Sequence, residues 1–156
     1  MRCKERLEAY LREQGVPFQT QHHPIAFTAQ EVAASEHVPG RMVVKIVMVL
    51  ANGKPVMLAL RATDRVELRK LAAVLGVAEV RLAEEREFGA LFPDCELGAM
   101  PPFGNLYGVP VYVDSALTED ETIVFQAGTH TDTMSLRYAD FARLVQPAVA
   151  DFAERV

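Results

Sequence analysis

A single lysine interrupts an otherwise apolar stretch, "RMVVKIVMVL", at residues 41–50. The stretch is too short to cross a membrane and is typical of a buried strand. Burial of an ammonium group is costly unless a partner compensates its charge. Lys45 is therefore expected either to reach solvent along its own apolar stem or to contact a bound anion or polarised carbonyl. Because Val44 and Ile46 flank it closely, even the first alternative requires that one face of the strand border a cleft.

A second candidate is the loop segment Gly98-Ala-Met-Pro-Pro102. Glycine permits close approach of the backbone to a ligand, and proline stiffens a loop. Free N–H groups on such a loop bind a carbonyl or its developing oxyanion. Because Pro101 and Pro102 have no N–H, the donors are expected at Gly98, Ala99 and Met100, or beyond the prolines. A purely structural turn is the alternative interpretation.

A third candidate lies at an expected strand end, where Gly128 precedes Thr129 and His130. A glycine beside polar residues at a strand terminus is common in the wall of a site, although a lone histidine is often structural. The four histidines form neither HxxxH nor HExxH, and no metal site is predicted. Cys3 and Cys95 match no metal spacing and are expected to be two ordinary thiols, since a disulfide is unlikely in a reducing compartment.

Composition points to an ordinary globular chain of 156 residues, long enough for one domain with its own core. The N-terminus has no secretory signal, and no stretch reaches the length of a membrane span, so we expect a cytoplasmic location and no membrane contact. The net charge of −5 argues weakly against a nucleic-acid partner. Residues 41–70 nevertheless hold seven basic and two acidic residues, which indicates either one basic face or two unrelated solvated helix faces.

The expected helices and strands follow from the periodicity of apolar residues and from the turn and capping residues that bound them. Thr28 and Glu31 have capping-box spacing, Asn52-Gly53 separates two apolar runs as in a hairpin, and Asp64 is expected to begin a helix that ends at Gly76. Helices are expected at residues 2–14, 29–37, 64–75, 84–92 and 138–145, and strands at 16–23, 41–50, 55–62, 79–83, 109–114, 121–128 and 133–138. Residues 146–156 form a tail that can extend the last helix. The fold class is α+β, a single domain over residues 1–156 with a mixed, largely antiparallel sheet and surrounding helices.

Together, and in this order, these features resemble the YbaK-like aminoacyl-tRNA deacylases, which are related to the editing domain inserted in bacterial prolyl-tRNA synthetases. The resemblance covers about residues 5–145. It is carried by "HHPIAFTAQEVA", by "VVKIVMVL" with its lysine, by the Gly98-x-x-x-Pro102 loop and by "FQAGTHTDTMSLRYADF". The combination is fairly specific, whereas each segment alone is not.

The resemblance implies hydrolysis, in trans, of the ester that joins a wrong amino acid to the terminal ribose of a tRNA. It implies no cofactor and no protein nucleophile, the terminal ribose hydroxyl of the tRNA taking part instead. The expected partners are a mischarged aminoacyl-tRNA, bound at its 3′ acceptor end, and an aminoacyl-tRNA synthetase, with no DNA. Catalytic roles are expected for Lys45, Gly98 and His130. Substrate contacts are expected from Phe27, Thr28, Ala99, Met100, Pro102, Gly128 and Thr129.

Two other functions are compatible with these residues. A non-catalytic module that binds aminoacyl-tRNA or an amino acid keeps the pocket without turnover. An interaction domain with an ordinary strand lysine loses neither binding nor activity when Lys45 is replaced. The amino acid removed, the tRNA recognised and the oligomeric state are not determined by the sequence.

Overall fold

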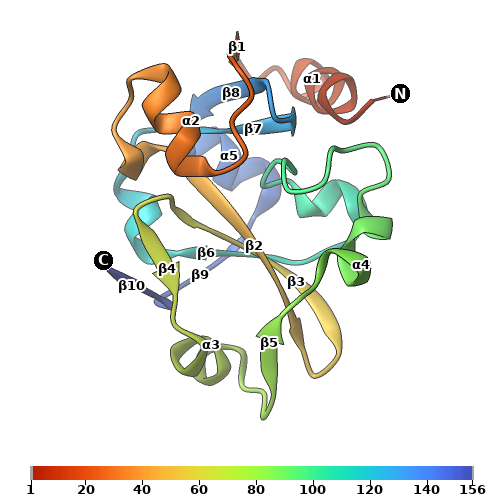
Figure 1. Ribbon diagram of the computed structural model, residues 1–156, viewed down its shortest axis with the longest axis vertical. Coiled ribbons are helices and arrows are strands. Elements are labelled where there is room, and N and C mark those ends of the chain that lie inside the picture. Colours follow the sequence, from red (N-terminus) through yellow and green to blue (C-terminus); the bar gives the residue numbers. More distant parts are fainter. Residues whose placement is uncertain (1, 156) are drawn as a thin grey trace.

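A mixed five-stranded sheet lies at the centre of the computed structural model, which describes residues 2–155 (Figure 1). Its strand order is β5-β2-β3-β6-β9, antiparallel from β5 to β3 and parallel from β3 to β9. The bounds are β2 Val44–Ala51, β3 Lys54–Arg61, β5 Val80–Leu82, β6 Val111–Asp114 and β9 Ala148–Ala150. Asn52 and Gly53 have φ of 49° and 81°, the positive values that a tight two-residue hairpin turn requires.

Two smaller sheets complete the β structure. One is antiparallel with the order β1-β8-β7, and its strands are β1 Gln19–His22, β7 Thr122–Thr129 and β8 Asp132–Arg137. The other pairs β4 Asp64–Val66 with β10 Ala153–Arg155. A bridge between Val43 and Val124 joins the start of β2 to β7, which brings the lysine strand beside the glycine-ended strand.

The helices cover the outside of these sheets, with α1 and α2 at the end of the molecule that carries β1, β7 and β8 (Figure 1). Within residues 2–155 the α-helices are α1 Cys3–Glu13, α2 Ala29–Glu36, α3 Leu68–Leu75, α4 Glu85–Phe88 and α5 Tyr138–Val145. The Thr28 hydroxyl accepts a hydrogen bond from the Glu31 N–H at 3.1 Å, so α2 begins where its capping sequence predicted. No described helix has the length and apolarity needed to cross a bilayer.

The apolar residues of the strands form two buried clusters. The largest buried cluster joins residues of β2 and β3 to residues of β7 and β8, with Phe103, Phe125 and Phe141 at its centre. A second cluster lies on the other face of the five-stranded sheet, where Leu71 of α3 and Phe152 pack against β2 and β3. The fold class predicted from the sequence is confirmed, although the strands form three sheets rather than one.

Two predicted elements are wrong. Asp64 does not begin α3, because it lies in β4 and the side chain of Glu67 accepts the Lys70 N–H at 2.8 Å as the true cap. Residues 146–155 do not extend α5, because Gln146 adopts a left-handed φ of 50° and the chain then forms β9 and β10. These strands depend on pairing with residues far away in the sequence, which local periodicity does not report.

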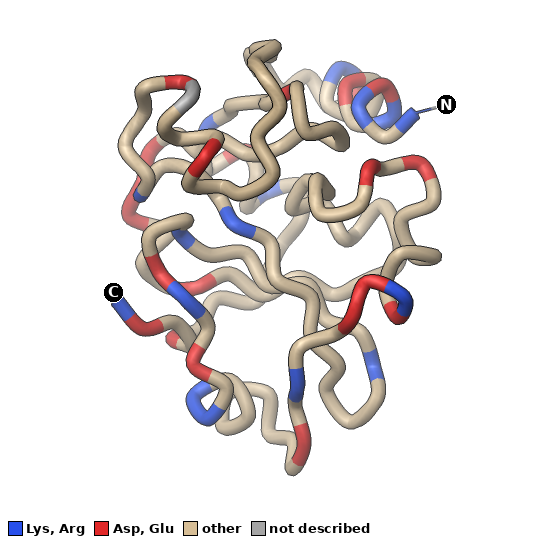
Figure 2. Tube along the Cα trace, viewed as in Figure 1, with Lys and Arg blue, Asp and Glu red and all other residues tan. Residues whose placement is uncertain are grey.

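The basic stretch does not form an open basic face. Figure 2 shows blue and red segments side by side along the edge where the C-terminus lies, and the ion pairs agree with it. Arg41 and Arg61 both contact Asp120, at 3.9 and 3.3 Å. The other pairs are Arg65 with Glu154 at 2.6 Å and Lys70 with Asp151 at 3.5 Å. Acidic residues from later in the chain therefore compensate much of the positive charge of residues 41–70.

Candidate functional site

A cavity of about 190 Å³ lies where α2, the start of β2, the Gly98 loop and β7 meet. It is lined by residues of the lysine strand and of the Gly98 loop, and by one further polar residue, Gln126. Its walls are formed by Phe27, Thr28, Ala29, Val44, Lys45, Ile46, Gly98, Met100 and Gln126. The hairpin with β3 and the bridge to β7 hold the start of β2 in this position.

Lys45 is half-buried at this cavity, and its ammonium donates a hydrogen bond to the backbone carbonyl of Asp64. Burial lowers the pKa of Lys45, the charge of Asp64 opposes that change, and Arg65 adds to it. Only a neutral carbonyl accepts from the ammonium among the described residues, so the cation is poised to attract an anionic or strongly polarised oxygen.

The Gly98 loop offers backbone donors to the same cavity. The Ala99 N–H is used, because it donates to the Glu96 carbonyl at 3.0 Å. Within residues 2–155 the N–H groups of Gly98 and Met100 have no hydrogen-bond partner, and both residues line the cavity. Backbone N–H groups without a partner, on residues that line the same cavity as a lysine, are the kind of donors that stabilise an oxyanion.

Gly98 is required by its backbone conformation. Its φ of +84° lies in the left-handed region that residues with a Cβ rarely adopt. A Cβ placed there meets the His130 Cε1 at 3.6 Å, an ordinary contact, so conformation rather than space excludes larger residues.

His130 lies at the rim of the cavity and is not among the residues that line it. Its Nε2 is 2.8 Å from the carbonyl of Leu97, so Nε2 carries the proton and Nδ1 is the acceptor. Its ring lies 4.8 Å from that of Phe27, which is 63% exposed. His130 thus joins the Gly98 loop to the segment that precedes α2, and both of its nitrogens already have partners.

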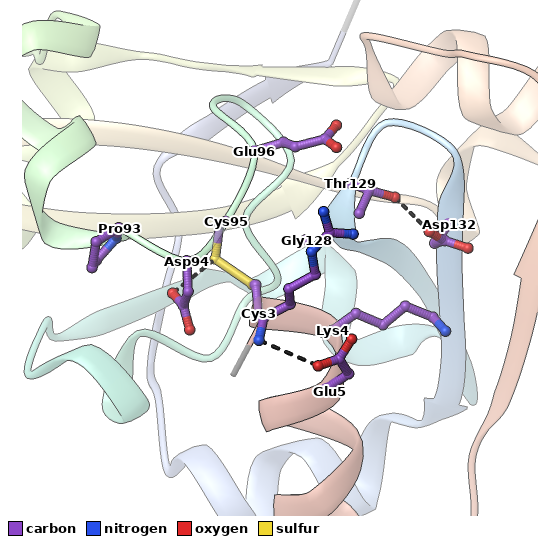
Figure 3. Close-up of a pocket in the computed structure, with 11 residues that line it drawn as sticks. Cys3, Lys4, Glu5, Pro93, Asp94, Cys95, Glu96, Gly128, Thr129 and Asp132 are labelled. Atoms are coloured by element: carbon purple, nitrogen blue, oxygen red, sulfur yellow. Dashed lines mark hydrogen bonds between the residues drawn. A yellow bond between two sulfur atoms is a disulfide. The ribbon is translucent and has the colours of Figure 1, made fainter.

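The remaining predicted residues lie elsewhere. Ala99 and Pro102 are buried within the loop, and neither lines the cavity. Gly128 and Thr129 border a different cavity, of about 360 Å³, beside α1 (Figure 3). A Cβ at Gly128 would lie 2.7 Å from the Cys3 Sγ, so this glycine permits α1 to pack on the end of β7.

The second cavity contains a disulfide, which corrects the expectation of two free thiols. Cys3 at the start of α1 is bonded to Cys95 in the loop before Gly98, with a Cα–Cα distance of 4.9 Å (Figure 3). The Cys3 N–H also donates to the Asp94 carbonyl at 3.0 Å. The two sulfurs and the Asp94 carboxylate lie within 4.8 Å of one another, but sulfurs bonded to each other are not thiolate ligands.

Gln126 is the cavity residue that sequence reasoning missed. It lies inside the apolar strand β7, between Phe125 and Ala127, and it is 9% exposed. Its Nε2 donates to the Ala26 carbonyl at 2.9 Å and lies 3.4 Å from the Nδ1 of His130. Its position as a single amide among apolar residues of a strand could have indicated a site residue, as the single lysine of β2 did.

Comparison with known proteins identifies the class of this fold and site. Residues 23–144 match the model of the aminoacyl-tRNA editing domain, and the chain belongs to that family. A solved structure of a proposed trans-editing enzyme for prolyl tRNA synthetase superposes with a TM-score of 0.84 at 21% identity, covering 97% of each chain. Identity this low shows a shared fold only.

Two curated relatives give the family its context. The chain is 28% identical over 153 residues to the multifunctional Ser/Thr-tRNA deacylase ProXp-y of Escherichia coli K12, covering 95% of this chain and 91% of that protein. It is 36% identical over 94 residues to the proline–tRNA ligase of Thiobacillus denitrificans, covering 60% of this chain. The matched segment spans only 15% of that ligase.

Proposed function

We propose that this chain is an aminoacyl-tRNA deacylase that hydrolyses the ester between a wrong amino acid and the terminal ribose of a tRNA. The observation that carries the proposal is one cavity lined by Lys45 and by Gly98 and Met100, whose N–H groups have no partner among the described residues. Membership of the editing-domain family and the deacylase relative support it.

The residues fit the reaction in a defined way. The N–H groups of Gly98 and Met100 donate to the ester carbonyl and to the negative oxygen that develops on it. The Lys45 ammonium adds positive charge beside that oxygen or a neighbouring phosphate. Water attacks the carbonyl carbon, the bond to the ribose oxygen breaks, and that oxygen takes a proton, releasing free amino acid and tRNA.

The nucleophile is water, because the lining of the cavity offers no better one among the described residues. Neither serine nor cysteine lines it, and Thr28 is the only hydroxyl there. The Thr28 oxygen already caps α2. This arrangement agrees with a family mechanism in which a substrate hydroxyl takes part, so we assign no protein nucleophile.

The rim is suited to the end of a tRNA. Phe27 lines the cavity and is 63% exposed, and Leu97, which is 44% exposed, lies on the other side of His130. Exposed aromatic and apolar groups beside a cavity provide a surface on which a terminal base stacks. We include in the proposal a cytoplasmic location, where aminoacyl-tRNA is found, one domain over residues 1–156, and association with a synthetase in trans.

A deacylation assay tests the proposal. Purified protein is mixed with tRNAs carrying Ala, Ser, Cys, Thr or Pro, and release of the amino acid is followed. Lys45→Met keeps the apolar stem without the charge and should lower kcat/KM by about 100-fold or more on every substrate released. Lys54→Met is the matched control, because Lys54 is an exposed lysine at the far end of the same hairpin.

The outcomes separate the alternatives. Equal rates in wild type and Lys45→Met, with both proteins folded, would remove Lys45 from the mechanism. Slower release than in buffer alone would show protection of the ester and favour the binding module over the enzyme.

A further inference from the structure

The loop that carries Gly98 offers two backbone donors, and the direction of each decides whether it can serve the cavity. In a planar trans peptide unit the C=O and the N–H point in opposite directions, and no cis peptide bond occurs within residues 2–155. The Gly98 N–H shares its peptide unit with the Leu97 carbonyl, and the Met100 N–H shares its unit with the Ala99 carbonyl. A group that binds either carbonyl therefore also directs the N–H on the opposite side.

The Met100 N–H is held by the backbone alone. The Ala99 carbonyl, on the opposite side of that peptide unit, accepts the N–H of Gly128 in β7 at 2.9 Å. The Met100 N–H thus points away from Gly128, and no side chain is needed to keep it in that direction.

The Gly98 N–H lies in a turn that does not fix its direction. The Ala99 N–H donates to the Glu96 carbonyl at 3.0 Å, and Gly98 has a φ of +84°, whereas Leu97 has no positive φ. These features define a type II turn. A type I turn keeps the same ends and reverses only the central peptide unit, and glycine adopts the negative φ of that turn as readily. A contact outside the turn must therefore hold the peptide unit between Leu97 and Gly98.

The Leu97 carbonyl is held by a side chain. Within residues 2–155 its only hydrogen-bond partner is the Nε2 of His130, at 2.8 Å. His130 is fixed in turn, because its own N–H donates to the Glu96 carboxylate at 3.0 Å and its ring lies 4.8 Å from that of Phe27. The Gly98 N–H consequently points away from the histidine.

Gln126 determines which imidazole nitrogen carries the proton. Its Nε2 donates to the Ala26 carbonyl at 2.9 Å and lies 3.4 Å from the Nδ1 of His130. An amide N–H that faces Nδ1 leaves that nitrogen as an acceptor, so the proton of the neutral ring is on Nε2, where the Leu97 carbonyl needs a donor. Because Gln126 is buried within β7, its contacts are shielded from water.

We infer that His130 is a positioning residue, which binds the Leu97 carbonyl and so keeps the Gly98 N–H directed into the cavity. Gln126 acts behind it by selecting the tautomer. This inference rests on the proposed deacylase function, and it differs from the direct catalytic role predicted for His130 from the sequence. Without the histidine the turn can change to type I, which replaces the donor N–H by a carbonyl that repels the developing oxyanion.

Three replacements of His130 separate the hydrogen bond from the ring. His130→Gln extends an amide N–H about as far as Nε2, His130→Asn is too short to do so, and His130→Phe keeps a ring without a donor. On the ester that wild type releases fastest, the Asn and Phe variants should lower kcat by about 10- to 100-fold, up to the effect of one lost oxyanion donor. KM should change little, because the lost contact acts on the transition state. His130→Gln should recover most of the rate.

The direction of the peptide unit is measured separately, without substrate. A type II turn holds Leu97 in an extended ψ, which gives a strong nuclear Overhauser effect between its Hα and the Gly98 N–H, whereas a type I turn gives a weak one. The effect should be strong in wild type and His130→Gln, and weaker in His130→Asn and His130→Phe. Long-range 1H–15N spectra of the imidazole should show the proton on Nε2 in wild type and a mixture of tautomers in Gln126→Met.

His22→Asn is the matched control. His22 is an exposed histidine of β1 that bonds Asp132 at 3.1 Å and is not a partner of the Leu97 carbonyl. Its replacement should change neither kcat nor the Overhauser effect at Gly98. Thermal unfolding of every variant shows whether a loss of rate reflects misfolding.

Several results would overturn the inference. A strong Overhauser effect in folded His130→Phe would show that the histidine does not hold the peptide unit. A weakened effect with unchanged kcat would show that the direction of the Gly98 N–H is unimportant. Equal losses of kcat in His130→Gln and His130→Asn would point to proton transfer by the ring.

Two further outcomes are decided by the wild-type spectra. If the His130 variants do not fold, a weak Overhauser effect or a proton on Nδ1 in wild type would reject the inference, and the expected spectra would support it. No release of any ester by wild type would reject the proposed function, while the Overhauser effect would still decide whether His130 holds the peptide unit.

Discussion

The pKa of Lys45 is lowered because this residue lies near the start of the buried strand β2. The alternation of β2 sets it on the same side as Val47 and Val49, which pack with the second core cluster. Its ammonium donates to the Asp64 carbonyl, and the residue is one of those that line the cavity. The side chain is thus half-buried and bonded to a backbone carbonyl, while its contact with a substrate stays a prediction.

The lowered pKa of Lys45 predicts an alkaline limit to activity. The ammonium form is the one that stabilises negative charge, so kcat/KM should fall as pH rises through a pKa below that of an ordinary lysine. The measurement is a pH profile of deacylation with the spontaneous hydrolysis of the ester subtracted. Lys45→Arg keeps its charge at all accessible pH values. Any activity that Lys45→Arg retains should show no such fall of kcat/KM at alkaline pH. The same fall in this variant would contradict the role assigned to the Lys45 ammonium.

The same shift has the opposite sign for folding. The unfolded chain binds this proton more tightly than the folded one, so stability should rise with pH between the folded and unfolded pKa values of Lys45. Activity and stability are therefore expected to change in opposite directions across that interval.

At the scale of elements, the disulfide fixes the end of α1 to the loop that carries Gly98. It joins residues separated by 92 positions. Further hydrogen bonds hold the loop to β7, from the Glu96 N–H to the Gly128 carbonyl at 2.8 Å and from the Gly128 N–H to the Ala99 carbonyl at 2.9 Å. Removal of the disulfide should therefore weaken the fold more than it disturbs the cavity.

Reduction of the Cys3–Cys95 disulfide should lower the free energy of unfolding by about 3 to 5 kcal/mol, because the reduced unfolded chain gains conformational freedom. Thermal unfolding with and without reductant measures the change in Tm. The double variant Cys3→Ser with Cys95→Ser is the control, and its Tm should not respond to reductant. An identical Tm for oxidised and reduced wild type would contradict the prediction.

Asp114 anchors the C-terminal strands. It is fully buried, and its carboxylate accepts N–H groups of Ala116, Phe152 and Ala153 at 3.1 to 3.2 Å. Arg155 lies 3.5 Å from it and 3.2 Å from Asp64, the residue whose carbonyl receives Lys45. The C-terminal tail, which was expected to extend α5, thus supports the position of Lys45.

Asp114→Asn should destabilise the protein by about 3 kcal/mol, because it removes the charge that pairs with Arg155 and accepts several N–H groups. Asp151→Asn is the control, since its ion pair with Lys70 is exposed and should contribute less than about 1 kcal/mol. Urea unfolding measures both. Equal effects in the two variants would show that burial of this carboxylate is unimportant.

For the whole molecule, many basic side chains of residues 41–70 pair with acidic side chains of the same chain and do not form an open basic surface for nucleic acid. The contacts of Asp120 with Arg41 and Arg61 are part of this compensation. A bound tRNA would therefore release few counterions, and most of the affinity would come from the acceptor end.

The dependence of tRNA affinity on salt should consequently be shallow, with a slope of log K against log salt of magnitude about 2 or less. Fluorescence anisotropy at several salt concentrations measures the slope. Asp120→Asn leaves Arg41 and Arg61 without their acid and should steepen it. A wild-type slope several times larger would show that a basic surface governs binding.

By itself, the sequence determined the features that short-range chemistry controls. Asn52-Gly53 specified a hairpin, Thr28 capped a helix, and the apolar run with one lysine marked a strand at a site. The family resemblance also assigned Lys45 and Gly98 to one reaction, and these roles stay a prediction. The predicted turn, cap and strand are confirmed, because turns, caps and alternation depend on residues a few positions apart.

Only the tertiary structure decided which distant residues meet. It paired Cys3 with Cys95, placed the C-terminal tail against β4 and moved Gly128 away from the candidate site. It also aligned the Gln126 amide with Ala26, 100 residues earlier. Such contacts depend on how sheets and helices pack, and packing is a property of the whole chain that no local pattern of residues encodes.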